Sequence, residues 1–226
     1  MHTGRSLITI WLLICSFTIL PSILAEDSFA KWEEPISAFE QADKENPPPA
    51  HPVLFVGSSS IRLWDLDKSF PNLKTLNRGF GGSTIADSIH FFDRIIRPYQ
   101  PKIIILYAGD NDIKKELSPR EVFENFKTLA NKIETSLPGT HLIYIAIKPS
   151  ISRKKLWPEM KQANDLIAAW CAQRSILSFA DIAKPMLDNP GHEPNPDLFK
   201  KDGLHLNEKG YELWRKVLSP LIQQTK

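Results

Sequence analysis

The chain has 226 residues, of which 42% are hydrophobic and 24% are charged, and its formal net charge at pH 7 is +2. These proportions are typical of globular proteins, so they argue against an intrinsically disordered chain, and the length suits one domain. The nearly neutral charge does not predict binding to nucleic acid or to an acidic membrane surface.

The first 25 residues have the layout of a secretory signal peptide. Arg5 precedes an uncharged apolar run, and Pro21 and the small residue Ala25 follow that run. This order predicts a leader, residues 1–25, that is cleaved after Ala25 and directs the chain to the periplasm or the exterior. The apolar stretch is nearly long enough to span a bilayer, so an uncleaved membrane anchor is the alternative. Once the leader is cleaved, no stable membrane insertion is expected.

Residues 26–52 are predicted to form an N-terminal helix followed by a proline-rich connector. Trp32, Ile36 and Phe39 are spaced by four and three residues, which places them on one face of an amphipathic helix. Pro35 is compatible with a helix that begins near it. The segment "NPPPAHP" then ends the helix and forms a stiff connector.

Short apolar runs alternate with helical patterns through residues 53–226. The predicted strands are "PVLFVG", "LKTLNRG", "KIIILYAG", "HLIYIAI" and "SILSFA". The predicted helices are "STIADSIHFFDRII", "SPREVFENFKTLANKIETS", "EMKQANDLIAAWCAQ" and "NEKGYELWRKVLSPLI". Five short strands separated by helices predict one doubly wound α/β domain around a parallel sheet.

Every predicted strand but the last is followed by a polar or glycine-rich segment. These segments are "GSSS" (57–60), "NRGFGGST" (77–84), "AGDND" (108–112) and "IKPS" (147–150), and "KDGLHLN" (201–207) precedes the last helix. Ligands of open parallel sheets bind at the carboxyl ends of the strands. We therefore expect a functional site where these segments meet.

The residue types in these segments suit nucleophilic catalysis. Asp202 and His205 are three apart, and a compact turn of that length brings a carboxylate to the imidazole Nδ1, leaving Nε2 free to accept a proton. A serine hydroxyl becomes a nucleophile when such a base removes its proton, and "GSSS" offers three candidates. Backbone N–H groups at Gly81 and Gly82, and the Asn111 side chain, are candidate donors to an oxyanion.

In order and spacing, the four segments around these residues resemble the signature blocks of the SGNH/GDSL hydrolase superfamily. The resemblance runs from about residue 50 to 215 and is closest to the branch of the platelet-activating-factor acetylhydrolases. It implies a flavodoxin-like three-layer αβα sandwich with a five-stranded parallel sheet, no metal or other cofactor, and ester hydrolysis through an acyl-serine. It selects Ser59 as the nucleophile, Asp202 and His205 as its partners, and Ser59, Gly82 and Asn111 as the oxyanion hole.

Two positions depart from the family pattern. Ser58 and Ser83 stand where the blocks usually carry an acidic residue. We expect both hydroxyls to hold their turns by local hydrogen bonds, as carboxylates do more strongly.

Other functions are compatible with parts of the pattern. Asp110, Asp112, Asp202 and His205 would form the site of a metal-dependent hydrolase if their loops converged. A non-catalytic carbohydrate-binding module would use the same cleft, and a phosphate-binding flavodoxin-like protein would use "GSSS" alone.

The loops after the strands determine which substrate fits, and their sequences do not predict the shape of the pocket. Lys148, Arg153 and Trp157 are candidates for contacting a polar leaving group on one side, and His192 and Phe199 for the opposite wall. Short acyl esters, acetylated carbohydrates and lipid-derived esters all remain open, and the sequence does not predict the oligomeric state.

Overall fold

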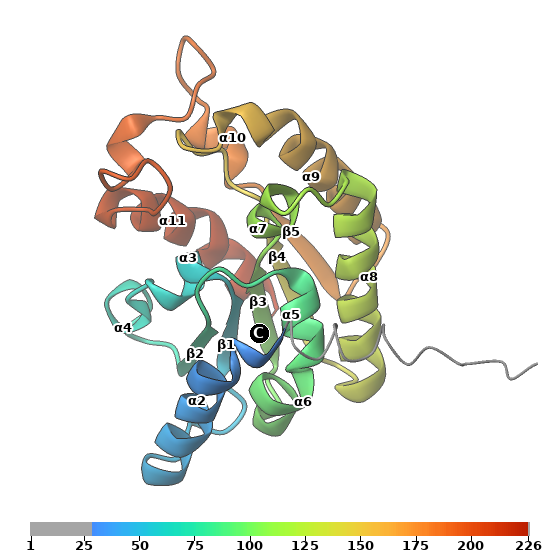
Figure 1. Cartoon of the computed structure of the whole chain (residues 1–226). Coiled ribbons are helices and arrows are strands. Elements are labelled where there is room, and N and C mark those ends of the chain that lie inside the picture. Colours follow the sequence, from blue (N-terminus) through green and yellow to red (C-terminus); the bar gives the residue numbers. More distant parts are fainter. Residues whose placement is uncertain (1–28, 226) are drawn as a thin grey trace, which may run out of the picture. The chain divides into compact units, whose positions relative to one another are not determined.

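A computed structural model describes residues 29–225, so the predicted leader lies outside the described residues. Residues from Trp32 onward form one compact unit, to which the following description applies. Its centre is a five-stranded parallel sheet with the order β2-β1-β3-β4-β5 and helices on both sides (Figure 1). This arrangement confirms the predicted fold class. The strands are β1 (Val53–Gly57), β2 (Thr75–Gly79), β3 (Ile103–Tyr107), β4 (His141–Ile145) and β5 (Leu177–Ala180).

The central strands are apolar because both of their faces are covered. Every residue of β1 and β3 is buried, as the continuous apolar runs predict for parallel strands between two helical layers. In the register of the sheet Gly57 lies opposite Gly79 on one side and Tyr107 on the other. The carboxyl ends of β2, β1 and β3 therefore lie level at one edge, where the segments that follow them meet.

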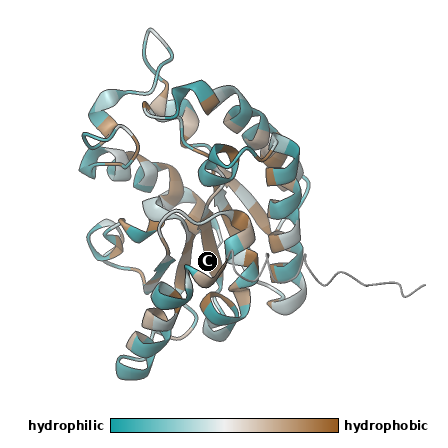
Figure 2. Ribbon diagram, in the orientation of Figure 1, coloured by the Kyte–Doolittle hydropathy of each residue, from teal (hydrophilic) through white to brown (hydrophobic). Residues whose placement is uncertain are grey.

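The two helical layers are built from short and long helices. Residues of α3, α4, α10 and α11 pack in one core with Phe55 and Ile105, while α8 packs against α5 and α9 in the other layer. Figure 2 shows hydrophobic residues gathered on the strands and on the helix faces turned toward them. The helices of these layers are α3 (Ser59–Arg62), α4 (Leu66–Ser69), α5 (Ile85–His90), α6 (Phe92–Ile95), α7 (Asp110–Lys114), α8 (Pro119–Ser136), α9 (Trp157–Cys171), α10 (Ala183–Met186) and α11 (Glu208–Gln224).

Two of the described helices begin with capping boxes. Ser118 and Glu121 form one around the first turn of α8, which begins at Pro119. Thr84 caps α5 in the same way. The helix predicted over residues 83–96 is divided, because the chain leaves helical geometry at Phe91 and resumes it in α6.

The N-terminal helix α2 (Glu33–Glu45) packs onto the same compact unit. It begins two residues before Pro35, as the position of that proline requires, and Ile36 is fully buried. Arg94 pairs with Glu33 and Glu40 at 2.7 Å each, which joins α2 to α6. Within residues 29–225 no helix is long and apolar enough to cross a bilayer.

Candidate active site

Ser59 lies at the sheet edge because β1 ends in a glycine turn. Gly57 has a φ of +133°, and a Cβ there would lie 1.9 Å from the carbonyl oxygen of Tyr107, so no side chain fits. The Ser58 N–H donates to the same carbonyl at 3.0 Å, and the chain then turns into α3 with Ser59 as its first residue. The Tyr211 hydroxyl holds the following turn by donating to the Ser60 carbonyl at 3.0 Å.

The expectation for the two departing serines is not met. The Ser58 and Ser83 hydroxyls are buried, and neither has a hydrogen-bond partner in the described part of the chain. Backbone hydrogen bonds hold these turns instead, from Ser58 to β3 and from Phe80 to Gly57. The hydroxyls therefore fill space where the family usually has a carboxylate.

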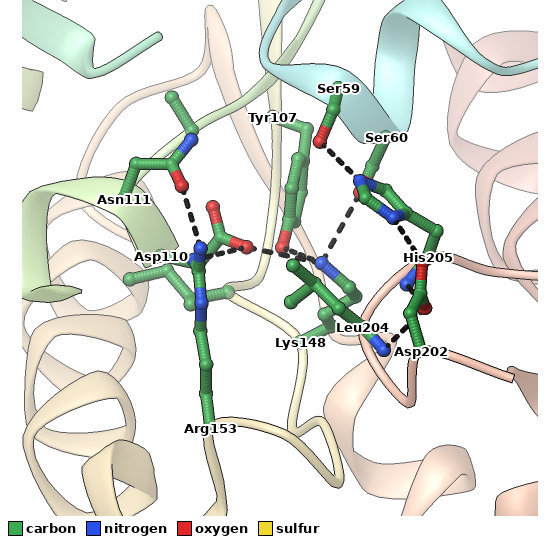
Figure 3. A network of polar contacts seen from close by, with 12 residues as sticks. Ser59, Ser60, Tyr107, Asp110, Asn111, Lys148, Arg153, Asp202, Leu204 and His205 are labelled. Atoms are coloured by element: carbon green, nitrogen blue, oxygen red, sulfur yellow. Dashed lines mark hydrogen bonds and ion pairs between the residues drawn. The ribbon is translucent and has the colours of Figure 1, made fainter. Parts of the chain in front are cut away.

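Asp202 and His205 lie on a tight turn before α11, and His205 stands between Asp202 and Ser59 (Figure 3). Asp202 Oδ1 accepts the backbone N–H groups of Leu204 and His205, both at 2.9 Å. Its Oδ2 lies 2.7 Å from His205 Nδ1, and His205 Nε2 lies 3.0 Å from Ser59 Oγ. The imidazole bond and the two backbone bonds hold the pKa of Asp202 well below its usual value, so this carboxylate is charged when it orients the ring.

The turn itself is fixed by neighbouring backbone. The Lys200 N–H donates to the His205 carbonyl at 2.8 Å, and Phe199 forms a β-bridge with the buried Leu206. Gly203, at a φ of +64°, accepts a hydrogen bond from the Ser152 N–H through its carbonyl. The loop after β4 and the histidine turn therefore support each other.

Three donors surround the mouth of the site. Gly82 has a φ of +79° in the turn after β2, and Asn111 lies on α7 after β3. Asn111 Nδ2 donates to the Ser83 carbonyl at 2.9 Å, which uses one of its two N–H groups. Within residues 29–225, the backbone N–H groups of Ser59 and Gly82 donate to no acceptor. They face a cleft of about 520 Å³ lined by Pro35, Ser59, Arg62, Gly81, Gly82, Asn111, Arg153, Leu204 and His205.

A buried ionic network lies beneath Asn111 (Figure 3). Lys148 Nζ is 3.1 Å from Asp110 Oδ2 and donates to the Tyr107 hydroxyl at 2.9 Å. Arg153 Nη1 lies 3.1 Å from the same carboxylate oxygen, and Nη2 donates to Asn111 Oδ1 at 2.9 Å. Because the guanidinium holds the amide oxygen, the amide nitrogen is turned away from it. The network thus fixes which end of the Asn111 side chain is available.

The charges of this network determine the ionisation of Asp110. Burial opposes ionisation of the carboxyl, but the two cations, Lys148 and Arg153, outweigh burial and hold the pKa of Asp110 below its usual value. Burial lowers the pKa of Lys148, and Asp110 counters this only in part.

Several residues predicted to contact the substrate lie elsewhere. Lys148 is 1% exposed and belongs to the buried network, because a lysine at this depth needs the carboxylate of Asp110. Trp157 lines a different cavity, of about 360 Å³, between α9 and α10. His192 lies on an exposed loop outside the cleft lining, and Phe199 is in the core. Of these five candidates, Arg153 alone lines the cleft.

Three cleft residues, Pro35, Arg62 and Leu204, were not predicted as site residues. Arg62 follows Ser59 by three positions on α3, and this spacing places both side chains on one face of the helix. The spacing could have been read from the sequence. Pro35 comes from α2, and its place at the cleft depends on how α2 packs, for which the sequence gives no signal.

The four residues of the metal-dependent alternative do not form one group. Asp110 faces Lys148 and Arg153, and Asp112 accepts the Ile85 N–H at 3.1 Å. Asp202 faces His205. Among residues 29–225, no cluster of three or more histidine, cysteine, aspartate or glutamate side chains is placed to hold a metal ion.

Comparison with known proteins supports an assignment by fold and by sequence. Residues 63–213 match the profile of the GDSL-like Lipase/Acylhydrolase family, a range that begins after Ser59 and contains Gly82, Asn111, Asp202 and His205. No curated protein matches the chain.

Several solved structures have the same fold, and the match covers nearly the full length of each of them. A Streptococcus pneumonia protein, provisionally named a platelet activating factor, has a TM-score of 0.75 at 20% identity, over 89% of this chain and 97% of that one. A GDSL-like lipase from Bacteroides thetaiotaomicron has a TM-score of 0.72 at 18% identity, over 84% and 98%. The lipase/acylhydrolase from Enterococcus faecalis has a TM-score of 0.61 at 20% identity, over 76% and 96%. At these identities the likeness shows the fold.

Proposed function

We infer that this chain, which belongs to the GDSL-like lipase/acylhydrolase family and is a carboxylic ester hydrolase, works through an acyl-serine intermediate on Ser59. The observation that carries this inference is the continuous hydrogen-bonded path from Asp202 through His205 to Ser59. A hydroxyl, an imidazole and a carboxylate in that order are the parts that acyl transfer to serine requires.

In the first half of the reaction, His205 Nε2 accepts the Ser59 proton while Oγ attacks the ester carbonyl. Asp202 holds Nδ1 protonated, so that Nε2 is the free acceptor, and stabilises the imidazolium that forms. The imidazolium then protonates the leaving alcohol, and the acyl group stays on Ser59.

The negative charge on the carbonyl oxygen is taken up by the N–H groups of Ser59 and Gly82 and by the second N–H of Asn111. The support for this role is that these donors lack other acceptors and face the same cleft as Oγ. Fixed donors need no reorganisation when the charge develops, and each is worth roughly 10²–10³ in rate. In the second half, water replaces the alcohol, and His205 activates it in the same way.

The test compares neighbouring serines. Replacing Ser59 by alanine is expected to lower kcat on 4-nitrophenyl acetate by about 10⁴-fold or more, because the nucleophile is lost. Ser58→Ala is the matched control: its hydroxyl has no partner in the described residues, so activity should stay within about twofold. A Ser59→Ala variant that retains full activity would contradict the mechanism.

The substrates remain those proposed from the sequence: short acyl esters, acetylated carbohydrates or lipid-derived esters. Pro35 and Leu204 line the cleft together with Ser59, and we propose that their side chains leave room for a small acyl group next to Ser59. An acyl-chain series on 4-nitrophenyl esters tests this, with acetate or butyrate expected to exceed octanoate in kcat/KM.

Export is the second part of the proposal. It is supported by the leader-like composition of residues 1–25. Expression of the full chain followed by N-terminal sequencing of the exported protein should give a chain beginning at Glu26. An intact N-terminus on a membrane-bound protein would support the uncleaved anchor instead.

A further inference from the structure

The cleft beside Ser59 has an unusual balance of charge. Its lining, as formed by residues 29–225, contains the guanidinium groups of Arg62 and Arg153 and no carboxylate. Asp202 lies behind the imidazole, where its oxygens are taken by His205 and two backbone N–H groups. The whole chain, by contrast, is nearly neutral. Positive charge is therefore concentrated where the substrate has to bind.

Arg62 is the cation of the cleft that has no partner of its own. Its side chain is exposed, and in the described part of the chain it forms no ion pair and no hydrogen bond. The guanidinium lies against Gly81 in the turn after β2, since a Cβ placed on Gly81 would come within 3.0 Å of Arg62 Nε and 3.4 Å of Nη2. The absence of a side chain at Gly81 leaves the room that this position of Arg62 needs.

The guanidinium of Arg153 adds to the positive charge of the cleft. Arg153 shares the carboxylate of Asp110 with Lys148, so that one buried anion faces two cations. Arg153 is 14% exposed and reaches the cleft beside Asn111. Arg62 therefore lines the cleft beside Ser59, and Arg153 lines it beside Asn111.

We propose that this cleft is specific for esters that carry an anionic group near the scissile bond, with Arg62 as the residue that binds the anion. The proposal rests on the function inferred above and names its substrate class. A guanidinium presents a planar set of donors that matches carboxylate, sulfate or phosphate oxygens. Binding such a group completes the hydrogen bonds that Arg62 lacks in the free protein.

The experiment uses two pairs of matched esters. In the first, 4-nitrophenyl hemisuccinate and 4-nitrophenyl butyrate share the leaving group, and one carries a carboxylate on the acyl chain. In the second, 3-carboxyphenyl acetate and phenyl acetate share the acyl group, and one carries a carboxylate on the leaving group. The ratio of kcat/KM between anionic and neutral ester is measured for the native chain and for Arg62→Gln, so that differences in intrinsic reactivity cancel.

Removing the guanidinium should lower the anionic-to-neutral ratio about tenfold in at least one pair, the size expected for a hydrogen bond to a charged group. The pair that responds tells whether the anion belongs to the acyl group or to the leaving group. Arg62→Lys should keep part of the preference, because it retains the charge but not the planar donors. Arg215→Gln, which removes an arginine of α11 outside the cleft lining, is the matched control and should leave both ratios unchanged.

A binding measurement tests the anion specificity independently of the catalytic mechanism. The amides succinamate and butyramide are titrated into the native chain and into Arg62→Gln by calorimetry. Where the acyl pair of esters responds, succinamate should bind more tightly than butyramide to the native chain, and Arg62→Gln should abolish that difference. Equal ratios in the native and Arg62→Gln proteins for both ester pairs would overturn the anion specificity. Undiminished hydrolysis of the neutral esters by Ser59→Ala would instead overturn the mechanism, whatever Arg62 does.

Discussion

Asp112 is the carboxyl group whose environment gives the sharpest prediction about stability. It lies on α7 directly after Asn111 and is fully buried. Oδ1 accepts the Ile85 N–H at 3.1 Å, and Oδ2 has no hydrogen-bond partner among the described residues. Burial, opposed by the Ile85 N–H and reinforced by nearby Asp110, raises the pKa of Asp112 to about 7.

The sign of the pH effect follows from the protons bound in each state. The unfolded chain loses the Asp112 proton near pH 4, whereas the folded protein keeps it until about pH 7. Between these values the folded state binds more protons, so stability falls as pH rises through this window and levels off above it. A separation of about 3 between the two pKa values corresponds to a free-energy cost of about 4 kcal/mol at alkaline pH.

The perturbation is Asp112→Asn, which keeps the shape and cannot ionise. At pH 5 two effects nearly offset each other: the native protein has lost about 1 kcal/mol because the unfolded chain is already ionised, and the variant loses about 1–3 kcal/mol to its unpaired buried amide. The two free energies of unfolding should therefore differ by less than about 2 kcal/mol. At pH 8.5 the variant gains about 4 kcal/mol because it cannot ionise and loses about 1–3 kcal/mol to its unpaired buried amide. It should therefore be more stable than the native protein by about 1–3 kcal/mol.

Urea unfolding of both proteins at the two pH values measures this difference. Asp165→Asn, at an exposed ion pair with Lys161, is the control and should change stability by less than about 1 kcal/mol at either pH. A difference between Asp112→Asn and the native chain that is the same at pH 5 and pH 8.5 would refute the reasoning.

The remaining predictions concern the buried network and the histidine turn. Asp110→Asn leaves Lys148 and Arg153 facing each other in the interior, so it should cost about 3–5 kcal/mol in urea unfolding, and Lys148→Met in the same background should restore part of that loss. Arg153→Met should lower kcat more than it raises KM on a neutral acetate ester, because Asn111 loses the partner of its amide oxygen; equal effects in Arg153→Met and Arg153→Lys would point to lost packing instead. Asp202→Asn should keep the fold by circular dichroism but lower kcat by about 10²–10⁴, because the imidazole tautomer is no longer fixed.

Much of the fold is readable because its signals are local. The runs around Phe55 and Ile105 are apolar without alternation, which is what strands covered on both faces require, and both strands form where the pattern predicts. The break at Phe91 is not readable, because Ile89, Phe92 and Ile96 continue one helical stripe across it.

The site is readable to the extent that it follows from the sheet. Parallel strands deliver their carboxyl ends to one edge, so Ser59 and Asn111 are expected together without knowledge of a single tertiary contact. The choice among three serines is different, because local sequence does not tell which hydroxyl faces His205. The family resemblance selects Ser59, and its Oγ is the one that lies 3.0 Å from Nε2.

Four of the five residues proposed from the sequence to contact the substrate lie outside the cleft lining, because their positions depend on contacts between distant segments. Lys148 follows a strand as an exposed lysine would, but it is paired with Asp110, which lies 38 residues away in the chain. Trp157 begins α9 and His192 lies on a loop, and the sequence does not specify where either element packs. Arg62 was within reach of prediction, since its spacing of three from Ser59 needs only the assumption of a helical turn.

Covalent labelling of the nucleophile tests the central claim most directly. A fluorophosphonate incubated with the native chain should form one adduct, located by mass spectrometry on the peptide that contains Ser59. Its formation should be slow in His205→Ala and absent in Ser59→Ala. Stable labelling of another residue, or hydrolysis of esters by a chain whose Ser59 never reacts, would contradict the account.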